Sequence, residues 1–369
     1  QQQQQQQQQQ DTLRLNKLFD DGMDARDICQ GQLGDCWLLS AIASLTTKPS
    51  TIENVFLTRE WNPRGKYDFR LYDPTQGKFT IVTIDDYIPV DKEGNPVFTT
   101  PNGNEMWVML LEKAFAKFMG SYAAIEGGYP LFALQVMTGG IVYKFSFDSK
   151  VDIWKRLEMK VNFKQGSKPD IRFGLASTKK KLDSIAMYEL IANYHSQGCL
   201  LSASTRGVDN TISEGRSKTG GIVPGHAYTI LEVYSPRFTL KTGIRLLKLR
   251  NPWGSFEWDG DWSDKSELWK KYPNIKFEMQ NFTTGDKSID DGIFYMSWDD
   301  FLKHFDGIDV CIIPSNLGDI KLDVIEEYSV CGSIVGCIIG TIKYWLCCCG
   351  LYHLWCAKST KVQAAALDV

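Results

Sequence analysis

The sequence is short of histidine and lacks any long run of one charge. It has 4 histidines in 369 residues, and 41 basic residues nearly balance 44 acidic ones. Proteins that bind nucleic-acid phosphates usually carry a basic patch, so we expect no nucleic-acid partner. Neither a Gly-x-Ser-x-Gly motif nor a phosphate-binding glycine loop occurs. Serine hydrolases of that type and P-loop enzymes are therefore excluded.

The chain also lacks an even framework of cysteines. Cys29, Cys36, Cys199 and Cys311 are scattered, whereas the others crowd the tail: Cys331, Cys337, Cys347, Cys348, Cys349 and Cys356. This spacing argues against a secreted disulfide scaffold and favours a cytoplasmic location. Ten glutamines, with no initiator Met, stand where a signal peptide would be. We expect the sequence to be a fragment or a processed product.

Hydrophobic patterning predicts an α+β fold, with a helical lobe followed by a lobe of antiparallel strands. The predicted helices span residues 36–45, 105–119 and 182–195. The predicted strands span residues 67–72, 79–90, 142–147, 200–205, 226–234, 244–250 and 292–296. Gly139–Gly140 is the expected boundary between the lobes. We divide the chain into disordered poly-Gln (1–10), a first lobe (11–138), a second lobe (139–316) and an apolar, Cys-rich tail (317–369).

Cys36 is the candidate nucleophile, with Asp35 as the expected N-cap of its helix. A thiol at the first turn of a helix lies at the positive end of the helix dipole, which favours the reactive thiolate. Gln30, six residues upstream, could donate to a developing oxyanion together with the Cys36 backbone N–H. Taken alone, Cys36 is more often a small buried hydrophobic residue.

A thiolate nucleophile needs a histidine base and a third group that orients it. His226 follows Pro224–Gly225 and opens a predicted strand, whereas His195 and His304 are expected at the surface. The next strand ends at Asn251. If the two strands pair antiparallel, His226 and Asn251 become neighbours. The Asn251 carbonyl could then orient the imidazole, and Trp253 could shield their hydrogen bond from water.

Six motifs, in order, resemble the protease core of the calpain family. They cover about residues 13–315: Gln30-Gly31-x-x-Gly34-Asp35-Cys36-Trp37-Leu38-Leu39, Leu110–Ala114, Gly225–Tyr228, Arg250–Gly254, Glu257-Trp258-x-Gly260-x-Trp262-Ser263-Asp264 and Asp291-Gly292-x-Phe294-Tyr295-Met296-Ser297. The resemblance implies a papain-like, two-lobe, intracellular endopeptidase. Its catalytic residues would be Cys36, His226 and Asn251, acting on protein substrates through a thioester.

The resemblance also implies control by calcium bound within the core. One site would use the carboxylates of Asp27 and Glu112 with backbone oxygens near Asp20 and Gly22. The other would use Glu257, Asp264 and Asp291. Such oxygens are the ligands that calcium prefers. The sequence departs from the family at Ile293, where another acid is usual, so the second site is expected to be the weaker one. Asp290 is a possible substitute.

The residues 330–356 are nearly all apolar, interrupted by Lys343. Two interpretations stay open. The segment could associate with a membrane, by spanning it or through acyl chains on Cys347, Cys348 and Cys349. Alternatively, it could pack on a further domain. The spacing of the tail cysteines matches no common zinc site.

Two other functions compete with proteolysis. A calpain-like module that binds partners without cleaving them usually lacks a triad residue, but Cys36, His226 and Asn251 are all retained here. A transglutaminase also uses a Cys–His pair. That family places Asp where this chain has Asn251, and it lacks the block Asn251–Gly254.

Overall fold

The computed structural model describes residues 17–19, 22–103, 105–176, 182–207, 220–234, 243–280 and 290–313. All of them belong to one compact unit. Asp20, the poly-Gln segment and the apolar tail lie outside the described residues. The structure therefore tests neither interpretation of the tail. The described chain combines helices with antiparallel sheets, as predicted for an α+β fold.

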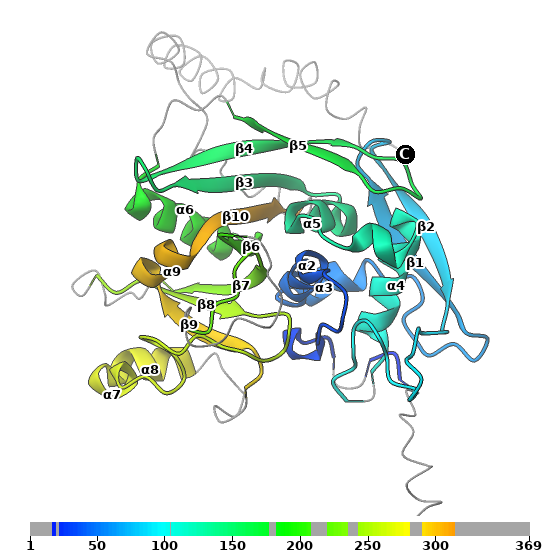
Figure 1. Ribbon diagram of the computed structural model, residues 1–369, viewed down its shortest axis with the longest axis horizontal. Helices are drawn as coiled ribbons and strands as arrows, with labels where there is room; N and C mark the ends of the chain where they lie inside the picture. Colours follow the sequence, from blue (N-terminus) through cyan, green and yellow to red (C-terminus); the bar gives the residue numbers. More distant parts are fainter. Residues whose placement is uncertain are drawn as a thin grey trace, which may run out of the picture. The chain divides into compact units, whose positions relative to one another are not determined.

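Residues 17–138 are here called the helical half. They contain α2 (Cys36–Thr46), here called the nucleophile helix because it begins with the candidate nucleophile Cys36 (Figure 1). Ten of the eleven residues of α2 are buried, because apolar or small residues occupy every side of it. This helix therefore lies within the main hydrophobic core. The elements of this half are η1 (Ala25–Asp27), α2 (Cys36–Thr46), α3 (Pro49–Glu53), β1 (Lys66–Asp73), β2 (Lys78–Asp85), α4 (Trp107–Met119), η2 (Tyr122–Ile125) and α5 (Pro130–Thr138).

Residues 139–313, the sheet half, form an antiparallel eight-stranded sheet in the order β5-β4-β3-β10-β6-β7-β8-β9. Its elements are β3 (Ile141–Asp148), β4 (Ile153–Asn162), β5 (Asp170–Leu175), α6 (Ser184–Ser196), β6 (Leu200–Thr205), β7 (Ala227–Tyr234), β8 (Leu246–Arg250), α7 (Leu268–Lys271), α8 (Pro273–Gln280), β9 (Ile293–Ser297), α9 (Trp298–His304) and β10 (Phe305–Ile312). The predicted antiparallel pairing of β7 with β8 is confirmed, with Thr229 opposite Arg250.

Hydrogen bonds join α2 to the sheet. Thr229 Oγ1 in β7 donates to the Ser40 carbonyl over 2.8 Å, and both residues are fully buried. Ser44 Oγ donates to the Leu201 carbonyl and accepts from the Leu201 N–H. The main hydrophobic cluster likewise continues from α2 and α4 to Leu200 and Ala227. The nucleophile helix is thus held against the strand that follows the candidate base.

Two expectations about strands are wrong. The strand predicted over residues 79–90 ends at Asp85. There the Asp85 carboxylate accepts the Tyr87 N–H and turns the chain. The sequence prediction also missed β4, β5 and β10. β10 lies between β3 and β6, strands far away in the sequence, so no local pattern reveals its pairing.

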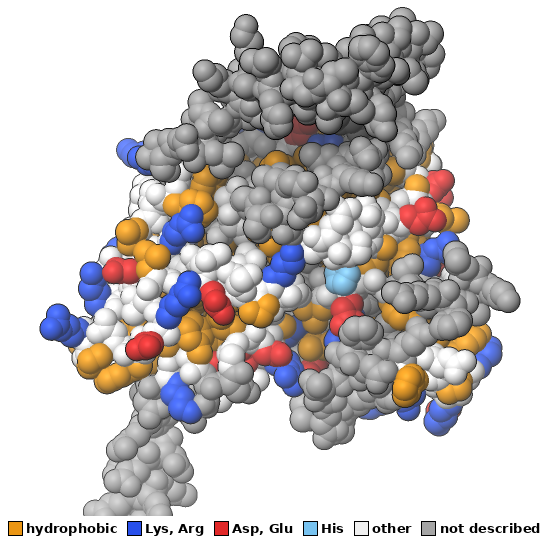
Figure 2. Space-filling model, turned by 180° about the vertical axis from the view of Figure 1, so that it is seen from behind, with side chains coloured by type: hydrophobic (Ala, Val, Ile, Leu, Met, Phe, Trp, Pro, Cys, Tyr) orange, Lys and Arg blue, Asp and Glu red, His pale blue; other side chains and the backbone are white. Residues whose placement is uncertain are grey.

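The surface carries charges of both signs. On the face shown in Figure 2, basic and acidic side chains lie among apolar ones. Among the described residues, no helix combines the length and the apolar character needed to cross a bilayer.

Candidate active site

Cys36 is the first residue of α2, and its side chain is buried. Asp35 occupies the N-cap position, but its carboxylate makes no capping hydrogen bond, so the predicted side-chain cap is wrong. The Asp35 carboxyl lies beside Glu112 instead. Burial, together with the charge of Glu112, raises the pKa of Asp35 well above its ordinary value.

His226 and Asn251 are in direct contact. The distance from His226 Nε2 to Asn251 Oδ1 is 2.9 Å, and both side chains are buried. Asn251 Oδ1 also accepts the Trp253 N–H, while Asn251 Nδ2 donates to the Phe256 carbonyl. Because Oδ1 can only accept, the imidazole proton lies on Nε2. Nδ1 is then the basic nitrogen, and within the described part of the chain it has no hydrogen-bond partner.

Aromatic rings enclose the imidazole. The His226 ring lies 4.9 Å from the Trp253 ring and 5.1 Å from that of Tyr228. Burial lowers the pKa of His226 to about 4, although the hydrogen bond to Asn251 opposes this shift. His226 is therefore neutral at neutral pH. Burial raises the pKa of Tyr228, and the charge of Cys36 adds to this effect. Cys36 and the imidazole of His226 thus both interact with Tyr228.

Gln30 is joined to the segment that follows Asn251. Its backbone N–H donates to the Pro252 carbonyl over 3.0 Å, and its Nε2 donates to the Leu33 carbonyl over 2.7 Å. Nε2 carries two hydrogens and uses one of them for that bond, so the second could donate to an oxyanion. The backbone at Gly31, the next residue, lies very close to Phe98. Only glycine fits there, since a Cβ would lie 1.6 Å from the Phe98 carbonyl oxygen.

The sequence analysis missed Thr205, which holds the backbone of His226. Thr205 Oγ1 accepts the His226 N–H over 2.8 Å, and the Thr205 N–H donates back to the His226 carbonyl. A threonine in a buried strand carries no local signal of such a role. His195 and His304, expected at the surface, are half-buried.

The second set of predicted metal ligands, Glu257, Asp264 and Asp291, places negative charges near one another. Glu257 Oε1 accepts the backbone N–H groups of Asp291 and Gly292 over 3.0 and 2.9 Å. Burial raises the pKa of Glu257 to about 7, and the charges of Asp264, Asp290 and Asp291 add to the shift. Mutually repelling oxygen ligands of this kind fit a hard divalent cation.

The first set is more dispersed. Asp27 Oδ2 accepts from the Asp24 backbone N–H and from Trp107 Nε1, whereas the Glu112 carboxylate accepts the Thr99 N–H. Gly22 has a φ of +116° and lies in the loop before η1. Across the residues that the structure describes, no three His, Cys, Asp or Glu side chains are arranged to hold a metal ion. Metal binding at the second set would therefore require its three carboxylates to move closer together.

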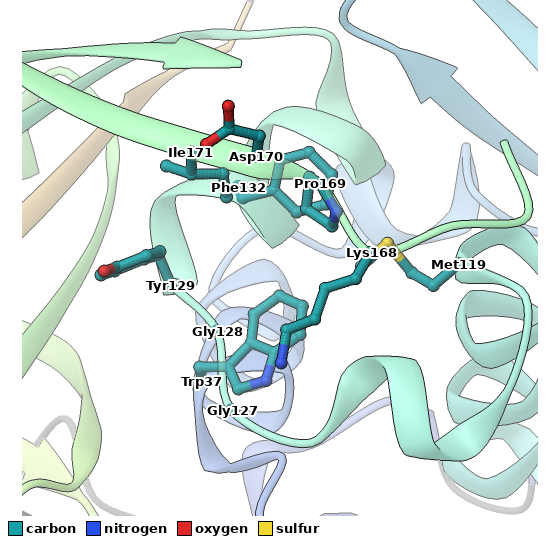
Figure 3. Close-up of a pocket in the computed structure, with 10 residues that line it drawn as sticks. All are labelled: Trp37, Met119, Gly127, Gly128, Tyr129, Phe132, Lys168, Pro169, Asp170 and Ile171. Atoms are coloured by element: carbon teal, nitrogen blue, oxygen red, sulfur yellow. The ribbon is translucent and has the colours of Figure 1, made fainter. Parts of the chain in front are cut away.

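A pocket of about 450 Å³ lies beside Trp37, the residue after Cys36 (Figure 3). Trp37 Nε1 donates to the Ile125 carbonyl, and Lys168 Nζ donates to the neighbouring Glu126 carbonyl. The residues that line the pocket are Trp37, Met119, Gly127, Gly128, Tyr129, Phe132, Lys168, Pro169, Asp170 and Ile171. This mixture of aromatic rings and backbone suits an apolar side chain.

Comparison with known proteins places the chain in a family. The model of the calpain family of cysteine proteases matches residues 1–312. The chain is 37% identical over 297 residues to calpain-type cysteine protease DEK1 of Zea mays, covering 80% of this chain and 12% of that protein. It is 32% identical over 302 residues to calpain-9 of Rattus norvegicus, covering 81% and 38%. Calpain-5 of Mus musculus is 31% identical over 311 residues, covering 80% and 44%.

The chain belongs to the calpain family of cysteine proteases, as the sequence motifs predicted. It spans less than half the length of each of these relatives. The helices and the antiparallel sheet agree with the protease core of that family.

Proposed function

We propose that this chain is a calcium-dependent cysteine endopeptidase that makes limited cuts in protein substrates. The observation that carries the proposal is the buried contact between His226 Nε2 and Asn251 Oδ1, which leaves Nδ1 as a base. Cys36, at the start of α2, supplies the nucleophile. The pocket beside Trp37 would receive an apolar side chain of the substrate.

The reaction follows from these groups. His226 Nδ1 accepts the proton of Cys36, and the thiolate attacks the scissile carbonyl carbon. The resulting oxyanion accepts hydrogen bonds from the Cys36 N–H and the Gln30 amide. When the tetrahedral intermediate collapses, the C–N bond breaks and the leaving amine takes the proton from His226. Water, deprotonated by His226, then attacks the thioester, and Cys36 regains its proton as the acid product leaves.

Calcium belongs to the same proposal. Glu257, Asp264 and Asp291 would hold one ion, whose positive charge offsets their mutual repulsion. Asp27 and Glu112, with backbone oxygens near Gly22 and Asp20, would hold another. An ionised carboxylate has about four acceptor sites, so Asp27 and Glu112 could bind the ion and still accept from Trp107 and Thr99.

The site favours proteolysis over the alternatives. A transglutaminase would require an acid where Asn251 meets His226. A module that binds without cleaving would have no need for a base held in one tautomer. We place the activity in the cytoplasm, where the thiol stays reduced. Membrane contact through residues 330–356 stays an interpretation of the sequence.

Casein cleavage tests the proposal. The chain should cleave casein in calcium chloride, and a chelator or Cys36→Ala should abolish cleavage. Cys199→Ala is the matched control, because Cys199 is a buried cysteine at the start of β6. Equal cleavage by the chain and by Cys36→Ala would refute the proposal, and full activity in excess chelator would refute its calcium dependence.

A further inference from the structure

Three contacts join residues 28–30 to residues 250–254, here called the junction. Arg250 Nη2 donates to the Ile28 carbonyl over 2.6 Å, and the Gln30 N–H donates to the Pro252 carbonyl over 3.0 Å. Gly254, with a φ of +70°, lies so close to Cys29 that a Cβ would be 3.0 Å from its Sγ. The segment that carries Gln30 thus lies directly on the segment that carries Asn251.

Arg250 is an unusual member of this junction. Its side chain is fully buried, and within the described residues its Nε and Nη1 atoms have no hydrogen-bond partner. Burial lowers the pKa of Arg250 to about 10, so the guanidinium is still charged at neutral pH. Burying an incompletely paired charge costs free energy that an apolar side chain would not. Fold stability alone is therefore a poor reason for an arginine here.

The charges around Arg250 come from both halves of the chain. Asp24 and Asp27 attract it from the helical half, and Asp291 attracts it from the sheet half. Arg26, which is paired with Asp24, is also attracted by Asp291. The guanidinium consequently draws the loop that contains residues 24–30 toward the carboxyl end of β8.

We propose that Arg250 is a positioning residue that holds the Ile28–Gln30 segment on the end of β8 and so sets Gln30 relative to Cys36. This inference rests on the proposed peptidase function. A donor misplaced by about 1 Å can cost about 100-fold in rate. A substitution of Arg250 would therefore weaken the hydrogen bond from Gln30 to the oxyanion, although Arg250 itself does not contact the substrate. The pocket that would receive a substrate side chain is lined by no residue of the junction.

Arg250→Met and Arg250→Lys test the inference, with Lys248→Met as the matched control. Lys248 is a buried basic residue of the same strand, but it pairs with Glu232 within the sheet half. We expect Arg250→Met to lower kcat for a fluorogenic peptide about 10- to 100-fold with less than about a 3-fold change in KM. Arg250→Lys, which keeps a charged donor group, should recover part of kcat. Lys248→Met should change kcat less than about 3-fold.

Hydrogen exchange provides a readout that does not depend on activity. Amides of residues 28–33 should exchange faster in Arg250→Met than in the unmodified chain, and Lys248→Met should leave them unchanged. Alkylation of Cys36 by iodoacetamide forms no oxyanion, so its rate should change far less than kcat. Unchanged exchange at residues 28–33 in a folded Arg250→Met variant would overturn the inference. Cleavage that does not depend on Cys36 would overturn the proposed function instead, while exchange would still report on the junction.

Discussion

The imidazole of His226 and the amide of Asn251 form a buried pair, with 2.9 Å between Nε2 and Oδ1. The pair joins the residue immediately before β7 to the residue immediately after β8, so it depends on the register of those two strands. An amide oxygen fixes the tautomer without adding a negative charge, and burial then keeps the imidazole neutral. In the proposed function, this neutral imidazole would accept the proton of Cys36.

Asn251→Ala should impair the base without removing it. The imidazole would lose the acceptor that fixes its tautomer and ring orientation, and we expect kcat/KM to fall about 100-fold. Steady-state cleavage of a fluorogenic peptide measures this effect. Asn193→Ala, at a half-buried position of α6, is the control. A variant with unchanged kcat/KM would show that Asn251 does not orient the base.

The buried His226 should make the fold sensitive to acid. The unfolded chain binds a proton near the ordinary pKa of 6.5, whereas folded His226 binds it only near about 4. Between these values the unfolded state holds more protons, so the free energy of unfolding falls as the pH falls. From neutral pH to about pH 5, His226 should account for a loss of about 2 kcal/mol.

Urea unfolding of the chain and of His226→Gln at both pH values measures this loss. The glutamine variant should lack the His226 component of the acid sensitivity. His195→Gln should retain most of it, because His195 is only partly buried. Parallel pH profiles for the chain and His226→Gln would contradict the prediction.

Trp253→Ala should let water reach the pair. Burial is the main cause of the lowered pKa of His226, and Trp253 supplies part of the apolar cover. The pKa should rise toward 6.5 when this cover is removed. An NMR titration of the histidine imidazoles, assigned with His226→Gln, measures the shift. Trp61→Ala, at a half-exposed tryptophan, should leave the pKa in place.

Calcium should stabilise the chain more strongly at about pH 8 than at about pH 5.5. The pKa of Glu257 is raised to about 7, so folding with Glu257 charged is opposed above that pH and relieved by a proton below it. A cation would provide the same relief at high pH. Thermal unfolding with calcium chloride or with a chelator measures the difference.

Glu257→Gln sharpens the calcium test. It should raise the unfolding temperature in chelator at about pH 8, because one of the repelling charges is gone. It should also remove most of the stabilisation by calcium. Glu267→Gln, an exposed acid in a pair with Lys270, should behave like the unmodified chain. A full calcium effect in Glu257→Gln would exclude Glu257 as a ligand.

Local chemistry was enough to predict much of the site. The helix that begins at Cys36 follows from a largely apolar run after Asp35, and β6 has the predicted bounds. The neighbourhood of His226 and Asn251 followed from one assumption, the antiparallel pairing of two consecutive strands. Short connections make such pairing frequent.

Other features depend on segments that are distant in the sequence. Asp35 is an expected N-cap residue by type and position, but distant segments bury it, and this burial, together with Glu112 of α4, raises its pKa. β10 pairs with β3 and β6 across long connections, so its place in the sheet could not be predicted.

The sequence by itself determined the family, the candidate nucleophile, base and orienting amide, and most of the elements that carry them, because these depend on residue type and short-range spacing. Only the tertiary structure decided which nitrogen of His226 meets Asn251, which carboxylates repel one another around Glu257, and that Arg250 is buried against the Ile28 carbonyl. The physical reason is that burial and charge interactions are set by what packs around a side chain, and those neighbours come from distant parts of the chain.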